Sequence, residues 1–206
     1  SMDSVNKFDH TTFQFWEERY KKNNINWDIG SATPIFKKWF QNQKKKHSIC
    51  VLGAGNGWDA IYLAEKGHEV TAIDFSQTAI SNIKHSAKIS NVKINALQEN
   101  IFNLGNFYNN TYDIVIEYTC FCAIDPKQRS EYIEVVNKIL KKGGKIVAIF
   151  FPIDNSVNNS GPPFAVNIDK TIKSFNKYFT LIHKQKSPLS IKPRRDREIF
   201  TILKKK

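Results

Sequence analysis

Short apolar segments alternate with longer amphipathic ones along most of this 206-residue chain, and this alternation constrains its fold more than any other feature. The run His47–Leu52 (HSICVL) is typical of a buried strand, and Trp58–Lys66 after it has helical spacing. Strands that alternate with helices form a mostly parallel sheet covered by helices. We predict strands over His47–Leu52, His68–Ile73, Val92–Gln98, Tyr112–Tyr118 and Lys145–Phe151, and helices over Trp58–Lys66, from a Ser76 cap to Ile89, and over Lys127–Lys141 with a stop at Gly143-Gly144.

The last third of the chain departs from this pattern. The elements predicted there are a polar loop over Asp154–Pro163, a helix over Asp169–Asn176, and strands over Tyr178–Lys186 and Glu198–Lys204. A closing pair of strands suits an antiparallel hairpin at the edge of a parallel sheet. We therefore predict an α/β, Rossmann-like domain with a seven-stranded, mostly parallel sheet, an antiparallel last strand and helices on both faces. Residues 47–206 would form this domain, and residues 1–46 a helical, aromatic-rich cap over its ligand.

A glycine-rich turn, residues 53–57 (GAGNG), lies between the first predicted strand and the first predicted helix. Glycines let the backbone turn sharply and approach a ligand, and the helix start presents free N–H groups. Asp74 ends the second predicted strand, where a carboxylate accepts hydrogen bonds from both ribose hydroxyls; the alternative is a helix-capping or turn residue. A dinucleotide site requires a third glycine where this chain has Trp58, so the pattern favours S-adenosylmethionine over a nicotinamide cofactor.

Four stretches between about Trp16 and Phe179 carry a family resemblance. They are Trp16-Glu17-Glu18-Arg19-Tyr20 with Trp27; Leu52-Gly53-Ala54-Gly55 with Tyr62-Leu63-Ala64 and Gly67-His68-Glu69-Val70-Thr71; Tyr118-Thr119-Cys120-Phe121-Cys122-Ala123-Ile124 with Pro126; and Pro152 with Gly161-Pro162-Pro163-Phe164. In this order they resemble the thiopurine S-methyltransferase family, especially its halide, thiol and thiocyanate methyltransferase branch. The resemblance implies a class I methyltransferase fold that uses S-adenosylmethionine and releases S-adenosylhomocysteine.

The resemblance also implies a set of cofactor-binding residues. Trp16, Tyr20 and Trp27 would wall the sulfonium, because aromatic faces attract cations by about 0.5–2 kcal/mol each. The alternative is that these are ordinary core aromatics of amphipathic helices. The other implied residues are Gly53, Ala54 and Gly55 at the amino-acid part of the cofactor, Asp74 and Phe75 at the ribose and the adenine edge, Asn100 and Ile101 at the adenine, and Tyr118 at the carboxyl end of the fourth strand.

The segment after the fourth predicted strand bears on the acceptor. Amine methyltransferases often have Asn/Asp-Pro-Pro-aromatic there, whereas residues 117–120 are Glu-Tyr-Thr-Cys, which argues against DNA or protein amines. Methyl transfer is an in-line displacement, and a small thiol, thiocyanate or halide needs little or no general base. We hypothesise that the Tyr118 hydroxyl is catalytic and orients the acceptor, so that Tyr118→Phe lowers kcat and preserves cofactor affinity. The alternative is a packing tyrosine at a strand end.

The net charge of +12 raises the question of a nucleic-acid partner. The densest basic patches, Lys44–Lys46, Arg194-Arg195 and Lys204–Lys206, are not interleaved with aromatic residues. This favours a lysine-rich enzyme surface that attracts small anions, without nucleic acid as a partner. Three other functions stay open, namely an RNA methyltransferase with steeply salt-dependent binding, a nicotinamide oxidoreductase, and a non-catalytic S-adenosylmethionine-binding protein.

Three cysteines, Cys50, Cys120 and Cys122, do not make a disulfide framework. The Cys120/Cys122 pair has no further ligands at zinc-site spacing, so we expect no metal. The chain has no apolar run of about eighteen residues or more, and its first ten residues lack the apolar core of a secretory signal. We therefore expect a monomeric, cytoplasmic enzyme without a membrane partner.

Overall fold

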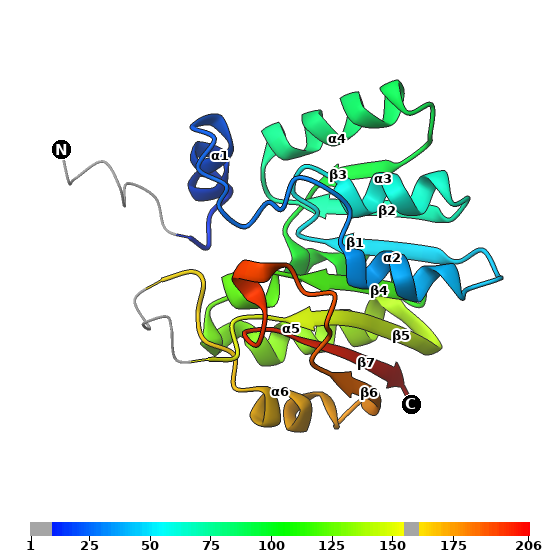
Figure 1. Cartoon of the computed structure of the whole chain (residues 1–206), viewed down its shortest axis with the longest axis vertical. Coiled ribbons are helices and arrows are strands. Elements are labelled where there is room, and N and C mark those ends of the chain that lie inside the picture. The colour runs from blue at the N-terminus through cyan, green and yellow to red at the C-terminus, as the bar shows by residue number, and fades with distance from the viewer. Residues whose placement is uncertain (1–9, 155–160) are drawn as a thin grey trace.

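The apolar runs of the sequence form the strands of a seven-stranded sheet (Figure 1). The computed structural model describes residues 10–154 and 161–206. The strand order is β3-β2-β1-β4-β5-β7-β6, and β7 runs antiparallel to both of its neighbours, β5 and β6, whereas the other paired strands are parallel. This confirms the predicted Rossmann-like sheet with its antiparallel last strand. The strands are β1 (Ser48–Leu52), β2 (Glu69–Asp74), β3 (Asn95–Gln98), β4 (Tyr112–Tyr118), β5 (Leu140–Phe150), β6 (Phe179–Gln185) and β7 (Ile199–Lys205).

Helices cover both faces of the sheet, because the central strands carry apolar side chains on both sides. On one face α2, α3 and α4 bury Phe36, Leu63 and Ile83; on the other, α5 and α6 bury Tyr132 and Phe175. In the described part of the chain, no helix has the length and apolar character needed to cross a bilayer. The helices are α1 (Phe13–Lys21), α2 (Pro34–Gln41), α3 (Trp58–Glu65), α4 (Gln77–Ile89), α5 (Arg129–Ile139) and α6 (Ile168–Phe175), with short 3-10 helices η2 (Ile101–Asn106), η3 (Phe121–Ala123), η4 (Pro126–Gln128) and η5 (Lys192–Arg194).

The prediction was wrong at Gly143-Gly144. These glycines were expected to stop the helix over Lys127–Lys141, but β5 already begins at Leu140 and runs through them. The first glycine has a φ of +79°, and a Cβ on the second would lie 2.8 Å from the Lys141 carbonyl oxygen. The pairing of β4 with β5 shifts register nearby, so the glycines belong to an irregular, bulged part of the strand.

Smaller differences concern the third strand and two segments that the structure covers in part. β3 begins at Asn95 rather than at Val92, so the predicted strand is shortened at its start. The loop expected over Asp154–Pro163 includes residues 155–160, and the N-terminal cap expected over residues 1–46 includes residues 1–9. Both of these stretches lie outside the described residues.

The N-terminal region divides between two places in the fold. α1 lies beside the start of α4, at the edge of the sheet where the parallel strands end (Figure 1). α2 instead packs on a face of the sheet through Phe36 and Phe40. Residues 22–33 connect the two helices, and we call this segment the strap. α1 and the strap therefore lie where they can cover a ligand, whereas α2 belongs to the layered core.

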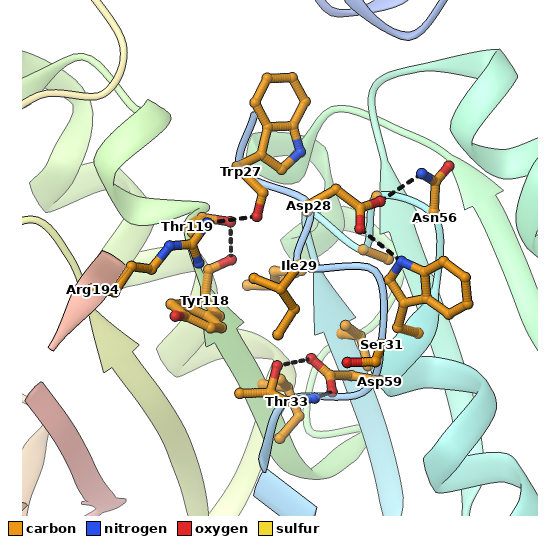
Figure 2. Close-up of a pocket in the computed structure, with 17 residues that line it drawn as sticks. Trp27, Asp28, Ile29, Ser31, Thr33, Asn56, Asp59, Tyr118, Thr119 and Arg194 are labelled. Carbon is orange, nitrogen blue, oxygen red and sulfur yellow. Dashed lines mark hydrogen bonds between the residues drawn. The ribbon is translucent and has the colours of Figure 1, made fainter. Parts of the chain in front are cut away.

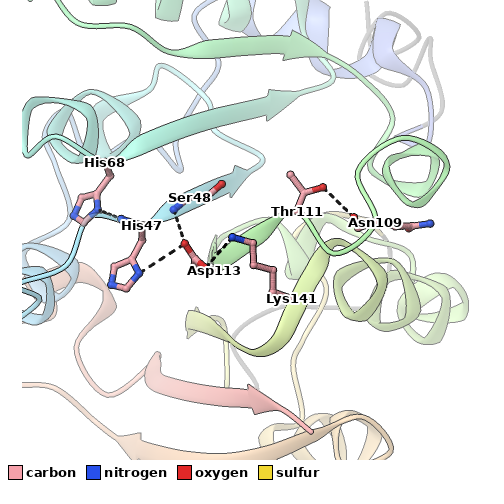
Figure 3. A network of polar contacts seen from close by, with 7 residues as sticks. All are labelled: His47, Ser48, His68, Asn109, Thr111, Asp113 and Lys141. Atoms are coloured by element: carbon pink, nitrogen blue, oxygen red, sulfur yellow. Dashed lines mark hydrogen bonds and ion pairs between the residues drawn. The ribbon is translucent and has the colours of Figure 1, made fainter.

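The amino ends of the strands are joined by polar contacts around Asp113 (Figure 3). Its carboxylate accepts a hydrogen bond from the Ser48 amide at 2.8 Å and lies 3.3 Å from the Lys141 ammonium. His47, just before β1, donates its backbone N–H to Nδ1 of His68, just before β2, at 3.0 Å. These histidines therefore have structural roles at the end of the sheet opposite to the cavity described next.

Candidate active site

A cavity of about 550 Å³ lies at the carboxyl ends of the parallel strands, and we call it the main cavity. Its walls come from α1, the strap, the turns after β2, β4 and β5, and the loop between β6 and β7. A second cavity of about 70 Å³, the small cavity, lies under the strap (Figure 2). Trp27, Gly53, Thr119 and Arg194 line both cavities, so the two adjoin. β1 and β4 are neighbours in the sheet, and the strands that follow each of them lie on opposite sides of this pair. The site thus lies at the point where the strand order reverses, as is usual for open α/β sheets.

The three predicted aromatic residues meet at one wall of the main cavity. Trp16 and Tyr20 come from α1 and Trp27 from the strap, and the ring centroids of Trp16 and Tyr20 each lie 5.7 Å from that of Trp27. The Trp16 indole donates to the His10 carbonyl at 2.8 Å, and the Trp27 indole donates to the Tyr20 hydroxyl at 3.4 Å. The cluster therefore has fixed ring orientations, and its contact with the sulfonium stays a prediction.

Glu17 fixes the position of α1, a role that the sequence analysis did not find. Its carboxylate accepts hydrogen bonds from the Thr78 amide, at 3.1 and 3.2 Å, and from the Ser76 hydroxyl at 3.2 Å. Burial alone would raise the pKa of Glu17, but these hydrogen bonds outweigh burial and hold the pKa below its ordinary value. A carboxylate is favourable there because the N-terminus of α4 is electropositive. The Glu17 carboxylate thus holds α1, with Trp16 and Tyr20, against the start of α4.

The glycine turn after β1 lies against the aromatic wall and against the turn after β4. A Cβ at Gly53 would lie 3.0 Å from Cβ of Cys120, and a Cβ at Gly55 would lie 3.0 Å from the Tyr20 hydroxyl. Gly53 lines both cavities, while Ala54 and Gly55 line the small cavity only. Glycine is therefore required at both positions by close packing as well as by their positive φ angles.

Asp74 ends β2 and lines the main cavity with Phe75. Its two carboxylate oxygens accept the backbone N–H groups of Gly55 and Ser76, both at 2.9 Å. Ser76, and not Asp74, caps α4, because its hydroxyl accepts from the Ala79 amide at 3.1 Å. A carboxylate has about four lone-pair sites, so these amides do not use its full acceptor capacity, and the contact of Asp74 with a ribose stays a prediction. Burial raises the pKa of Asp74 to about 6.

The predicted adenine contacts lie next to Asp74 and Phe75. Asn100 and Ile101 follow β3 and line the main cavity. The Asn100 side chain caps η2 by accepting from the Phe102 amide at 3.0 Å, which orients the start of that turn. The carboxyl ends of β2 and β3 thus bring together four predicted residues whose contact with adenosine stays a prediction.

Tyr118 lies at the end of β4 and lines the small cavity rather than the main one. Its hydroxyl, hypothesised to orient the acceptor, donates a hydrogen bond to Glu198. Arg194 lies over the Tyr118 ring, with the guanidinium carbon 5.1 Å from the ring centroid. Burial raises the pKa of the Tyr118 hydroxyl. The catalytic role of Tyr118 stays a prediction. Among the described residues, Arg194 is the cation found in contact with the Tyr118 ring.

Arg194 was interpreted from the sequence as part of a surface basic patch, and this was wrong. The side chain is only 7% exposed, and it lines both cavities. One guanidinium nitrogen donates to the Trp27 carbonyl at 2.6 Å, which joins the β6–β7 loop to the strap (Figure 2). No local pattern distinguishes Arg194 from the exposed Arg195 beside it, because its burial depends on residues distant in the sequence.

The strap is anchored to the glycine turn and α3 by two carboxylates (Figure 2). Asp28 accepts from the side-chain Nδ2 of Asn56 at 2.6 Å and from the Trp58 indole at 2.8 Å. Asp59 accepts from the Thr33 amide at 2.7 Å and from its hydroxyl at 2.8 Å. These contacts explain why Trp58 occupies the position of a dinucleotide-binding glycine, since its indole secures the strap instead.

A buried carboxylate, Glu117, holds the turn that follows β4. It accepts from the Tyr132 hydroxyl at 2.5 Å and from the Cys120 amide at 3.2 Å. Burial raises the pKa of Glu117 to about 7. Burial also raises the thiol pKa values of Cys120 and Cys122, which line the main cavity as protonated, unreactive groups.

Replacing Glu117 by glutamine is expected to change how stability depends on pH. Because the folded pKa lies above the ordinary value of 4.5, the native state holds a proton that the unfolded state releases. The stabilisation from this group is full below pH 4.5 and is lost as the pH rises through 7, a change of roughly 3 kcal/mol. Urea unfolding of both proteins between pH 4 and 8.5 measures this effect. The free energy of unfolding of the wild type minus that of Glu117→Gln should fall as the pH rises.

The control for that measurement is Glu131→Gln, which removes an exposed carboxylate from α5. It should leave the pH profile of the unfolding free energy unchanged. Parallel profiles for the wild type and Glu117→Gln would contradict the assignment of the buried proton to Glu117.

Comparison with known proteins identifies the family. Residues 11–204 match the family described as thiopurine S-methyltransferase (TPMT). The chain is 28% identical over 158 residues to probable thiol methyltransferase 2 of Arabidopsis thaliana, which covers 75% of this chain and 68% of that protein. It is 25% identical over 171 residues to thiocyanate methyltransferase 1 of the same plant, with 81% and 74% coverage.

A solved structure shares the fold. It is the Burkholderia thailandensis 1,6-didemethyltoxoflavin-N1-methyltransferase with bound 1,6-didemethyltoxoflavin and S-adenosylhomocysteine. The TM-score is 0.76 at 17% identity, over 94% of this chain and 86% of that one. With the family match over most of its length, the chain belongs to the thiopurine S-methyltransferase family and is an S-adenosylmethionine-dependent methyltransferase.

Proposed function

We propose that this enzyme transfers the methyl group of S-adenosylmethionine to a small thiol, thiocyanate or halide. The observation that carries the proposal is the main cavity, which joins two different surroundings in one space of about 550 Å³. One end, the donor end, has the aromatic wall of Trp16, Tyr20 and Trp27 together with Asp74. The other, the acceptor end, lies beyond Thr119 at the carboxyl ends of β4 and β5.

The donor end suits a nucleoside that carries a cationic sulfur. The sulfonium is attracted by the faces of the indole and phenol rings, while the ribose diol is matched to the free lone pairs of the Asp74 carboxylate. Asn100 and Ile101 continue the same wall toward the adenine. The donor supplies an activated methyl group, and these residues of the chain orient it toward the acceptor end.

The acceptor end suits a small, polarisable nucleophile. Phe151 and Pro163 contribute apolar surface, Cys122 a neutral thiol, and Arg194 a positive charge. A lone pair on the acceptor attacks the methyl carbon while the bond from that carbon to the sulfonium breaks, and S-adenosylhomocysteine leaves. An anionic acceptor carries no proton to remove, so alignment and exclusion of water are the main requirements. The relatives named for thiol and thiocyanate methylation support this choice.

The backbone at Thr119 supports a function at the junction of the two ends. Thr119 has a φ of +60°, which is rare for a β-branched residue, and it lines both cavities. Such strain persists where the surrounding structure imposes it, commonly at functional sites. The strained turn therefore supports a functional role for the segment that follows β4.

An acceptor panel tests the proposal, with S-adenosylhomocysteine release as the readout. The panel contains thiocyanate, hydrosulfide, iodide, an aromatic thiol, 6-mercaptopurine, an amine and RNA, with a reaction that lacks acceptor as the control. We expect kcat/KM for at least one of the first four to exceed that for mercaptopurine at least tenfold. Preference for mercaptopurine, the amine or RNA would overturn the proposal, as would donor binding without turnover of any acceptor.

A further inference from the structure

Arg194 has the properties of a buried anion-binding residue. It comes from η5 in the β6–β7 loop, and its guanidinium carbon lies 5.1 Å from the ring centroids of both Tyr118 and Phe151. Tyr118 ends β4 and Phe151 follows β5, and Arg194 and Phe151 both line the main cavity, so the cation lies at its acceptor end. A guanidinium has five N–H donors, and one of them donates to the Trp27 carbonyl. Arg194 also lines both cavities.

Tyr118 lies between Arg194 and a buried carboxylate. The Arg194 guanidinium lies over the Tyr118 ring, and the Tyr118 hydroxyl donates a hydrogen bond to Glu198. Glu198 is only 2% exposed and lines neither cavity. One positive and one negative charge are thus held inside the protein and linked through one tyrosine.

The charge balance of the Arg194–Tyr118–Glu198 group changes when an anion binds. With Arg194 positive and Glu198 negative, the net charge is zero, and an anion at Arg194 leaves an excess negative charge in a shielded place. Charges of the same sign in such surroundings favour protonation of one of them. Glu198 is the carboxyl group linked to that cation, and burial already raises its pKa above the ordinary value. Reciprocity then requires that protonation of Glu198 strengthen anion binding.

We infer that Arg194 binds the anionic acceptor and that Glu198, linked to it through Tyr118, takes up a proton when the anion binds. This inference rests on the proposed function and specifies the charge of its acceptor. Glu198 and Tyr118 are positioning residues, because they act on the acceptor through Arg194. The hydroxyl of Tyr118 thereby has a role even though it donates to Glu198.

Other titratable groups must be separated from Glu198. The charged and titratable side chains that face Glu198 are Arg194, from η5, and Tyr118, from β4. The other titratable and charged groups on the main cavity are present in every variant below. They are His10, Arg19, Tyr20, Asp74, Glu99, Cys120, Cys122, Asp125 and Arg197, of which Arg197 is paired with Asp154. The difference between wild type and a Glu198 variant therefore isolates the proposed proton.

The test is calorimetric titration of the enzyme–S-adenosylhomocysteine complex with sodium thiocyanate, whose anion does not titrate between pH 5 and 8. Two non-phosphate buffers of equal pH and different ionisation enthalpy report the protons taken up per anion. We expect uptake of up to one proton in the wild type, and a Kd that rises by up to about tenfold per pH unit. In Glu198→Gln, uptake should be lost and the Kd should stay low at every pH.

Two further variants define the result. Arg194→Gln should raise the thiocyanate Kd at least tenfold and leave the S-adenosylhomocysteine Kd within twofold. Asp169→Asn, which removes an exposed carboxylate paired with Lys184, should match the wild type in both measurements. Tyr118→Phe should reduce proton uptake without abolishing thiocyanate binding, because it interrupts the link between Arg194 and Glu198.

Zero proton uptake by the wild type overturns the inference, and this measurement does not depend on the folding of any variant. Equal uptake by Glu198→Gln also overturns it, as does unchanged thiocyanate affinity in Arg194→Gln. Failure of the proposed function is distinguishable, since it appears in the acceptor panel as an absence of methylated anions. Methylation of thiocyanate without linked proton uptake would leave the proposed function intact and remove only this inference.

Discussion

Replacing Asp74 by asparagine is expected to weaken the binding of S-adenosylmethionine about 100-fold. The carboxylate is buried at the end of β2, where its oxygens accept the Gly55 and Ser76 amides and where Asp74 lines the main cavity. Hydrogen bonds to a charged group contribute about 1.5–3 kcal/mol each, and asparagine keeps one acceptor oxygen. A loss of about 2.7 kcal/mol in binding corresponds to that factor. Calorimetric titration of donor and product measures it.

S-adenosylhomocysteine should lose as much affinity as the donor, because both carry the ribose. The matched control is Asp113→Asn, which removes a carboxylate that also accepts a backbone amide, at the opposite end of the sheet. It should lower the melting temperature without changing the donor Kd by more than about twofold. Donor affinity that is unchanged in Asp74→Asn would show that Asp74 only braces the turn between Gly55 and Ser76.

Replacing Gly57 by alanine is expected to destabilise the fold by about 2–5 kcal/mol. Gly57 precedes α3 with a φ of +82°, and an alanine in left-handed conformation costs about 1–2 kcal/mol. A Cβ there would also lie 2.7 Å from Cγ1 of Ile83, a fully buried residue of α4. Overpacking of this kind adds about 1–3 kcal/mol. Equilibrium unfolding in urea measures the sum.

Gly30→Ala separates the two contributions. Gly30 has a φ of +77°, close to that of Gly57, but no atom beyond its chain neighbours lies within 4 Å of the added Cβ in the described structure. Its replacement should therefore cost only the conformational part, about 1–2 kcal/mol. Equal losses in the two variants would mean that Ile83 moves aside freely and that packing at the glycine turn is loose.

Features that depend only on residues close by in the sequence were predictable from it. β4 has the predicted limits Tyr112–Tyr118, because a short run rich in β-branched and aromatic residues favours a buried strand. Ser76 caps α4 as predicted, since an N-cap hydroxyl needs only the amide three residues on. The glycine pair after α5 was misinterpreted, because glycine permits a helix stop and a strand bulge alike, and only the partner strand distinguishes them.

The sequence by itself determined the type of sheet, the place of its glycine turn and Asp74, and the membership of the aromatic wall. These follow from local patterns and from motifs in a fixed order. Only the tertiary structure decided that Arg194 is buried while Arg195 is exposed, that Glu17 docks α1 on α4, and that Tyr118 donates to Glu198. The physical reason is that burial and hydrogen bonding of a charged side chain depend on partners that chain folding brings from distant positions.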